Sequence, residues 1–122
     1  KGEDYIFAAP INMYSLAYPE KSSNWTNRFQ MFATENMWTF ILLDSYNGRL
    51  WQVQYSTQDL DNLFCIPINK YELVENNERC IFSIQPLTSM YQYYLINDNT
   101  GDMWKFQWST KGDDYRWIER FR

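Results

Sequence analysis

The sequence predicts an all-β, antiparallel domain made of two tandem four-stranded meanders and one additional N-terminal strand. The main observation is an internal repeat, because residues 37–66 match residues 90–119 at an offset of 53 residues without a gap. A repeat of this length indicates a duplicated supersecondary unit. In addition, aromatic residues make up 20% of the chain, which favours strands. Short apolar runs separated by turn residues are also typical of all-β domains.

The repeat organises the chain as a single domain over residues 1–122, with an N-terminal strand at 5–12, repeat one at 28–68 and repeat two at 79–121. The N-terminal strand is predicted because residues 6–16 echo residues 63–73 at a second offset, 57 residues. Each repeat is expected to hold four strands. In repeat one these are Phe29–Ala33, Trp38–Asp44, Leu50–Ser56 and Leu63–Ile68. In repeat two they are Phe82–Pro86, Tyr91–Asn97, Met103–Ser109 and Arg116–Phe121.

The third strand of each repeat alternates aromatic or apolar residues with polar ones. A period of two places the two kinds on opposite faces, so this strand should have one buried face and one wet face. The second strand of repeat one is apolar on both faces and should be central. The side chains expected to point inward are Phe40, Leu42, Trp51, Val53, Tyr55, Tyr93, Leu95, Trp104, Phe106 and Trp108.

Two tight hairpins are expected between the second and third strands, at Asn47-Gly48 and Thr100-Gly101. Glycine can adopt the left-handed conformation that closes such a turn. Residues 45–48 and 98–101 should each form a type I turn that ends in a glycine bulge. Two units are too few for a closed propeller, which needs about four blades. We therefore expect a pseudo-twofold barrel or sandwich with the N-terminal strand near the C-terminal one, or a propeller-like assembly of copies.

The segment Phe40–Trp51 resembles the F-x-L-L-D-x-x-T-G-R-x-W hairpin of propeller blades and of small uncharacterised bacterial proteins. The short strands at residues 64–68 and 115–118 resemble the strand that closes such hairpins. The resemblance covers most of residues 29–121 and implies a blade-like β-meander, but it implies no activity and no functional residues. Repeat two departs from the motif, with Asn97 in the place of Asp44 and Asp102 in the place of Arg49.

Composition excludes several kinds of chemistry. The chain has no histidine, which excludes nucleophile–histidine catalysis, and its 4 glycines are scattered, so no phosphate-binding loop is expected. We expect no cofactor and no metal, since zinc and EF-hand spacings are missing. The net charge of −4 argues against nucleic acid as a partner. No apolar run is long enough to span a bilayer, so no membrane insertion is expected. Cys65 and Cys80 are either free thiols or a disulfide.

Aromatic side chains are the strongest functional lead, because Trp and Tyr stack on sugar rings and dominate protein interfaces. We expect a non-catalytic binding module that recognises a glycan or a protein through loop aromatics. The candidate ligand-binding residues are Trp25, Tyr46, Tyr115 and Trp117, with Tyr14, Tyr18 and Tyr71 as weaker candidates. Loops carry function more often than strands do.

Two alternatives remain open. The first is a carboxylate-dependent glycan hydrolase, or a calcium site, built from Asp59, Asp61, Asp113 and Asp114. The second is a structural subunit that assembles with copies of itself, so a homo-oligomer is a possible state. The chain begins at Lys1, which is compatible with removal of a secretion signal or a tag upstream. A periplasmic or secreted location is favoured over a cytoplasmic one.

Overall fold

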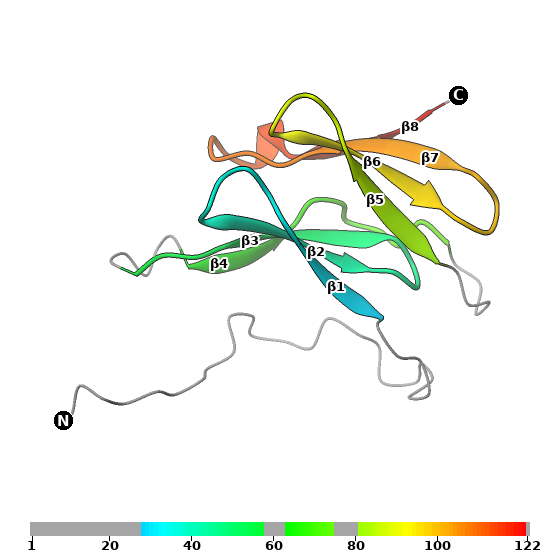
Figure 1. The fold of residues 1–122 in the computed structure, drawn as a ribbon, viewed down its shortest axis with the longest axis horizontal. Helices are drawn as coiled ribbons and strands as arrows, with labels where there is room; N and C mark the ends of the chain where they lie inside the picture. The colour runs from blue at the N-terminus through cyan, green and yellow to red at the C-terminus, as the bar shows by residue number, and fades with distance from the viewer. Residues whose placement is uncertain (1–27, 58–62, 75–80, 122) are drawn as a thin grey trace.

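The computed structural model of the protein describes residues 28–57, 63–74 and 81–121. The predicted N-terminal strand at 5–12 lies outside the described residues. The described residues form two four-stranded antiparallel sheets (Figure 1). The first sheet holds, in order, β1 (Phe29–Ala33), β2 (Thr39–Asp44), β3 (Arg49–Gln54) and β4 (Phe64–Pro67). The second holds β5 (Phe82–Pro86), β6 (Gln92–Asn97), β7 (Met103–Gln107) and β8 (Trp117–Arg120). A short 3-10 turn, η3 (Asp113–Tyr115), precedes β8.

The all-β, antiparallel, duplicated architecture predicted from the sequence is confirmed for the described residues. β1 and β5 have the expected bounds, and the other strands differ from expectation by at most two residues at either end. Each sheet is a simple meander in which every strand pairs with its neighbour in sequence. The sheets do not pair with each other among the described strands, and each keeps two open edges. Closure into a barrel or propeller is therefore not shown.

Both tight hairpins form as predicted. The amide of Gly48 donates to the carbonyl oxygen of Asp44 at 2.9 Å, and that of Gly101 donates to Asn97 at 2.7 Å. Both glycines have φ = 80°, a left-handed conformation that disfavours residues with a Cβ atom. The side chains of Asp44 and Asn97 each accept a hydrogen bond from the amide two residues on, which supports the turn.

The motif aspartate has a partner other than Arg49. Asp44 is fully buried and forms a bidentate ion pair with Arg28, with both N–O distances 2.9 Å. Arg49 instead lies over the ring of Trp51 and donates to the carbonyl oxygen of Asn69. Bidentate pairing satisfies both carboxylate oxygens, which offsets the cost of burying the charge.

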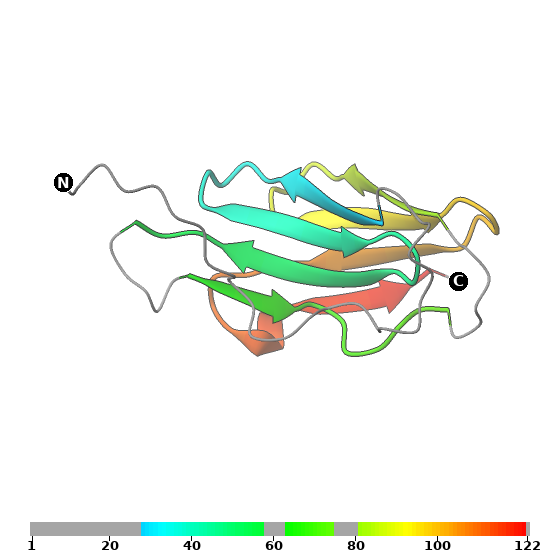
Figure 2. The ribbon, with the colours of Figure 1, turned by 90° about the horizontal axis from the view of Figure 1, so that it is seen from below.

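The two sheets pack front to back, with their strands in the same order (Figures 1 and 2). We call the face of each sheet that carries Trp51 or Trp104 its front, and the face that carries Gln52 or Lys105 its back. The back of the first sheet contacts the front of the second. The shared buried cluster consists of Ile41, Leu43, Leu50, Ile68, Phe82, Tyr93, Leu95, Trp104, Phe106 and Trp108.

Front-to-back packing corrects the predicted core of repeat one. Repeat two matches the prediction, because its front residues are buried between the sheets. In repeat one the back residues Ile41, Leu43 and Leu50 take that place. Tyr55 was expected inside but is 47% exposed. The remaining expected residues of repeat one, which are half-buried or buried but outside the shared cluster, are Phe40, Leu42, Trp51 and Val53.

The predicted pseudo-twofold relation is also wrong. A twofold axis between facing sheets would bury the same face of both sheets. Here the back of the first sheet is buried against the front of the second, so the fronts of both sheets point in the same direction and the units follow one another in a stack. The alternation in β3 identified an apolar face correctly, but the buried polar residue on the other face, Gln52, made that face look wet. Alternation alone does not reveal which face meets the second sheet.

Backbone hydrogen bonds join the first hairpin turn to the second sheet and to the chain after β4. The amide of Phe82 donates to the carbonyl oxygen of Ser45 at 3.0 Å, and that of Leu73 donates to Asn47 at 2.8 Å. The Asn47 side chain donates to Glu72 at 2.7 Å. The turn is thus enclosed, whereas the equivalent turn at residues 98–101 is exposed.

Replacing a back-face apolar side chain with alanine should lower the free energy of unfolding by different amounts in the two sheets, even at corresponding repeat positions. Leu43→Ala removes a fully buried side chain from between the sheets and should lower the free energy of unfolding by about 2–5 kcal/mol. Ile96→Ala, at the same position on the outer back face of the second sheet, should cost about 1 kcal/mol because Ile96 is only half-buried. Urea denaturation at low protein concentration measures both. Equal costs would contradict front-to-back packing.

The two turn glycines provide a second matched pair. Both substitutions with alanine force a Cβ into a left-handed conformation, at about 1–2 kcal/mol each. A Cβ on Gly48 would lie 2.9 Å from Leu73 Cδ1 and 3.1 Å from Phe82 Cε1, whereas one on Gly101 meets nothing within 4 Å. Gly48→Ala should therefore cost at least about 1 kcal/mol more than Gly101→Ala in thermal or urea unfolding. A larger loss at Gly101 would disprove the enclosed position of the first turn.

Candidate functional site

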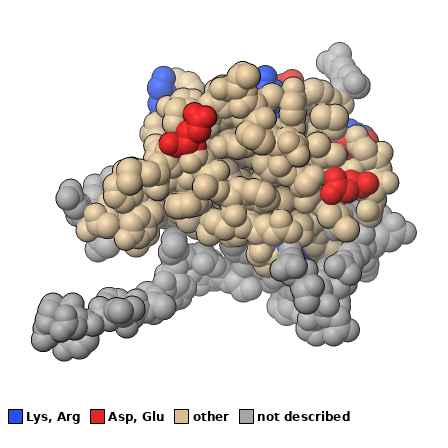
Figure 3. All heavy atoms as spheres, viewed as in Figure 1, with Lys and Arg blue, Asp and Glu red and all other residues tan. Residues whose placement is uncertain are grey.

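The surface shown in Figure 3 is largely uncharged, with isolated acidic and basic groups. This face offers no continuous basic track for a phosphate backbone. Among the described residues, no helix is long and apolar enough to cross a membrane. Polar and aromatic groups are therefore the features from which a site can be built.

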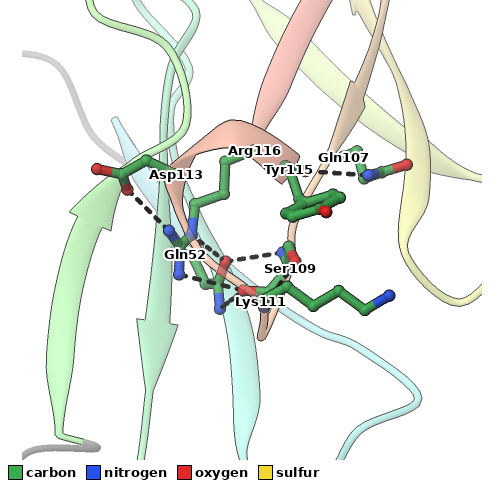
Figure 4. Close-up of polar contacts among 7 residues, drawn as sticks. All are labelled: Gln52, Gln107, Ser109, Lys111, Asp113, Tyr115 and Arg116. Atoms are coloured by element: carbon green, nitrogen blue, oxygen red, sulfur yellow. Dashed lines mark hydrogen bonds and ion pairs between the residues drawn. The ribbon is translucent and has the colours of Figure 1, made fainter.

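A buried amide connects the two sheets at the end of β7 (Figure 4). Gln52, on β3, is fully buried. Its Nε2 donates to the carbonyl oxygen of Ser109 at 2.9 Å, and its Oε1 accepts from the amide of Ser109 at 3.1 Å. Arg116 Nε donates to the same Oε1 at 2.7 Å. The Gln52 side chain thus bonds both the N–H and the carbonyl oxygen of Ser109, as the backbone of a neighbouring strand would, and it holds the chain after β7 to the first sheet.

Arg116 completes this connection. Its side chain is only 7% exposed, and Nη2 donates to Ser109 O at 3.1 Å while Nη1 contacts Asp113 Oδ1 at 2.8 Å. The guanidinium also lies near the ring of Phe64, 5.9 Å from its centroid. These contacts distribute the charge of a nearly buried cation over several acceptors. They fix the course of residues 109–116, which form one side of a pocket.

The pocket has a volume of about 210 Å³. Tyr91 and Tyr115 are 39% and 50% exposed at its wall. Tyr91 packs on the fully buried Trp108 at 4.7 Å between ring centroids, and Trp108 Nε1 donates to the carbonyl oxygen of Met90 at 3.0 Å. The lining residues are Ser89, Tyr91, Gln107, Trp108, Ser109, Thr110, Lys111 and Tyr115.

Polar groups hold the aromatic walls in place. Gln107 Nε2 donates to the carbonyl oxygen of Tyr115 at 2.9 Å, and Gln107 Oε1 accepts from Gln92 Nε2 at 2.8 Å. An amide has two donors and two acceptor positions, so Gln107 retains capacity for a ligand. The ammonium of Lys111 lies 5.5 Å from the centroid of the Tyr115 ring. The site combines aromatic faces, an amide, hydroxyl groups and one cation.

The structure places the predicted binding residues in different environments. Tyr115 lines the pocket. Trp117 is half-buried on β8, outside this pocket. Tyr46 is only 3% exposed, with the Arg28 guanidinium 4.9 Å from its ring centroid, so the expectation of an accessible loop aromatic is wrong there. Trp25 lies outside the described residues.

The weaker candidates are equally dispersed. Tyr71 is 78% exposed on the chain after β4, whereas Tyr14 and Tyr18 lie outside the described residues. Two pocket residues were not predicted as site residues: Tyr91, which directly precedes β6, and Gln107, the last residue of β7. Trp108 was predicted in the core, where it does lie, but its neighbour Tyr91 extends the same aromatic pair into the pocket. Both repeats carry aromatic residues at these two positions, Trp38 and Tyr55 in repeat one and Tyr91 and Trp108 in repeat two, and this coincidence was the signal that could have identified the cluster.

Carboxylate and thiol chemistry gains little support within residues 28–57, 63–74 and 81–121. No group of three or more potential metal-ligating side chains occurs there. Asp113 is paired with Arg116, and Asp59 and Asp61 lie outside the described residues. Cys65 is a free thiol, and burial raises its pKa, so it is protonated at neutral pH. Cys80 lies outside the described residues.

Substitution of the buried amide tests whether it connects the sheets. Gln52→Leu leaves the Ser109 amide and Arg116 Nε without their acceptor and should lower the free energy of unfolding by about 2–3 kcal/mol. Lys105→Leu, at the same repeat position on the outer back face, is the matched control and should change it by about 0.5 kcal/mol or less. Urea denaturation measures both. Similar effects would mean that Gln52 contributes nothing specific.

Comparisons with known proteins add no assignment to this geometry. No protein-family model matches the chain. Neither curated proteins nor solved structures gave a match. The pocket beside Tyr115 must be interpreted from its own chemistry.

Proposed function

We propose that the protein is a non-catalytic binding module whose pocket between Tyr91, Trp108 and Tyr115 takes a carbohydrate ring. The observation that carries the proposal is the combination of two exposed tyrosines with amide and hydroxyl groups around about 210 Å³ of space. This volume is below the range usual for drug-sized ligands, which favours a single ring over a larger ligand.

The aromatic faces supply the apolar part of recognition. The C–H groups of a sugar ring pack on an aromatic face, and tyrosine does so with little loss of side-chain freedom. Tyr91 is positioned by Trp108, and Tyr115 is positioned through its backbone by Gln107. Two walls that are held by separate contacts need little reordering on binding, which favours affinity.

The polar groups supply the directional part. Gln107 has remaining donor and acceptor capacity, and Ser89, Ser109 and Thr110 contribute hydroxyl groups. Sugar hydroxyls both donate and accept, so they match such a mixed set. The one cation, Lys111, lies at the ring of Tyr115 and would favour an acidic or strongly polar sugar over an apolar ligand.

A protein ligand is the competing class, because tyrosine is also common at protein interfaces. The small volume favours a sugar unit over a peptide segment. For a hydrolase, Asp113 would have to act with a second carboxylate, but its side chain is already held by an ion pair with Arg116 at 2.8 Å, which favours a structural role for Asp113.

Intrinsic fluorescence offers a direct test. The protein is titrated with gluco-, xylo-, chito- and uronate-containing oligosaccharides, and binding is confirmed by calorimetry. Tyr115→Ala and Tyr91→Ala should each weaken binding about tenfold while leaving the unfolding midpoint nearly unchanged, because both side chains are partly exposed.

Tyr71→Ala is the matched control, since Tyr71 is more exposed than either and lies outside the pocket. Its affinity should equal that of the wild type. If no oligosaccharide binds, or if Tyr115→Ala binds the sugar as tightly as Tyr71→Ala does, the assignment to carbohydrate in this pocket is wrong.

A further inference from the structure

The stacking of the two sheets leaves two unlike outer faces. Among residues 28–57, 63–74 and 81–121, no further layer of strands lies on the front of the first sheet or on the back of the second. A face-to-face pair would bury both of its apolar faces. A front-to-back pair instead leaves the front of the first sheet and the back of the second sheet on the outside. A front and a back are also the two kinds of face that pack together inside the molecule.

The outer front is exposed where its counterpart is covered. Phe29 is 37% exposed, whereas Phe82, 53 residues later, is 1% exposed. Tyr55 is 47% exposed, whereas Trp108 is fully buried. Met31, on the edge strand β1, is 55% exposed, and its counterpart Ile84 packs against the core. At the centre of this front, Trp51 is already buried. The exposed residues of the outer front therefore lie at its margin, where a stacked sheet covers the corresponding residues of the second unit, whereas Trp51 and Val53 at its centre are buried.

The outer back shows the same relation in reverse. Ile68 is 6% exposed between the sheets, whereas Phe121, at the same repeat position, is 44% exposed. Ile81, which directly precedes the front residue Phe82 and so alternates with it onto the outer back, is 48% exposed at the opposite edge of the same sheet. The other apolar residues of the outer back, which correspond to the fully buried Ile41, Leu43 and Leu50 and are themselves half-buried, are Tyr94, Ile96 and Met103.

The outer back and the outer front differ from the two internal faces at one pair of corresponding positions, and the two differences concern charge. Inside the molecule, Gln52 of the back accepts from Arg116. On the outer back, Lys105 occupies the position of Gln52, and a cation there would repel an arginine. The residue of repeat one that corresponds to Arg116 is Leu63, which carries no charge. At this position, the contact between an outer back and an outer front would therefore not place two cations together.

We propose that the outer back of the second sheet binds the outer front of the first sheet of another copy of this chain, head to tail. The contact places a back on a front, as between the two sheets within one molecule, and uses the exposed margin of the outer front at Phe29, Met31 and Tyr55. A second copy is the occupant that carries both complementary faces. Because the two patches differ, the contact does not close on itself as a twofold dimer does, and it produces rings or open chains.

Sedimentation velocity tests the proposal over a range from about 10 μM to 1 mM of the full chain. The wild type should show concentration-dependent species beyond the monomer. Met31→Glu, on the outer front, and Phe121→Glu, on the outer back, should each reduce the protein to monomer. Tyr71→Glu, on the chain after β4 at a side chain that is 78% exposed, should associate as the wild type does.

Mixing the two monomeric variants gives the decisive result. Met31→Glu retains an intact back and Phe121→Glu retains an intact front, so an equimolar mixture should form a heterodimer and nothing larger. Circular dichroism and the melting temperature verify that each variant folds, and Ile81→Glu replaces Phe121→Glu if the latter does not. A monomeric wild type at about 1 mM, or a mixture that stays monomeric, would overturn the proposal.

Discussion

The burial of an aliphatic back face against an aromatic front face is the interaction on which the rest of the structure depends. A four-stranded meander has two faces and cannot bury either alone. Ile41, Leu43 and Leu50 lose all contact with water only because Leu95, Phe106 and their neighbours lie opposite. The enclosed hairpin turn and the bonding of Ser109 to Gln52 both exist at the margins of this contact. The pocket beside Tyr115 exists in turn because residues 109–116 are fixed by that bonding.

Much of the local structure could be predicted from the sequence. Strand positions followed from alternation and from turn glycines, because these depend on a few neighbouring residues and on backbone sterics. Gly48 and Gly101 had to occupy a conformation that few other residues tolerate, so their turns were well determined. The duplicated unit was visible because the same positions meet the same requirements in both copies. Closure and symmetry were not determined in this way.

The relation between the sheets could not be predicted because each sheet has a front and a back that are both apolar. Gln52 illustrates the difficulty, since a glutamine in an alternating strand indicates a wet face. Its burial is explained by acceptors and donors from residue 109 and residue 116, more than 50 residues away in the chain. The candidate site was only partly predicted for the same reason. Tyr115 was identified as a loop aromatic, but Tyr91 and Gln107 become its neighbours only through folding. Tyr46 looked accessible in a turn that the second unit encloses.

The stacking has a consequence for how such a chain can change its length. In a twofold arrangement, both units use the same face to contact each other, so a third unit would find no free face of that kind. In a front-to-back stack, every junction joins the back of one unit to the front of the next, so an inserted unit of 53 residues meets a face of the kind it needs on either side. Unequal recombination within the coding sequence would therefore produce longer or shorter stacks that already have working interfaces. The substitutions that distinguish the two repeats, such as Asn97 for Asp44, record how far two initially equal units have since diverged.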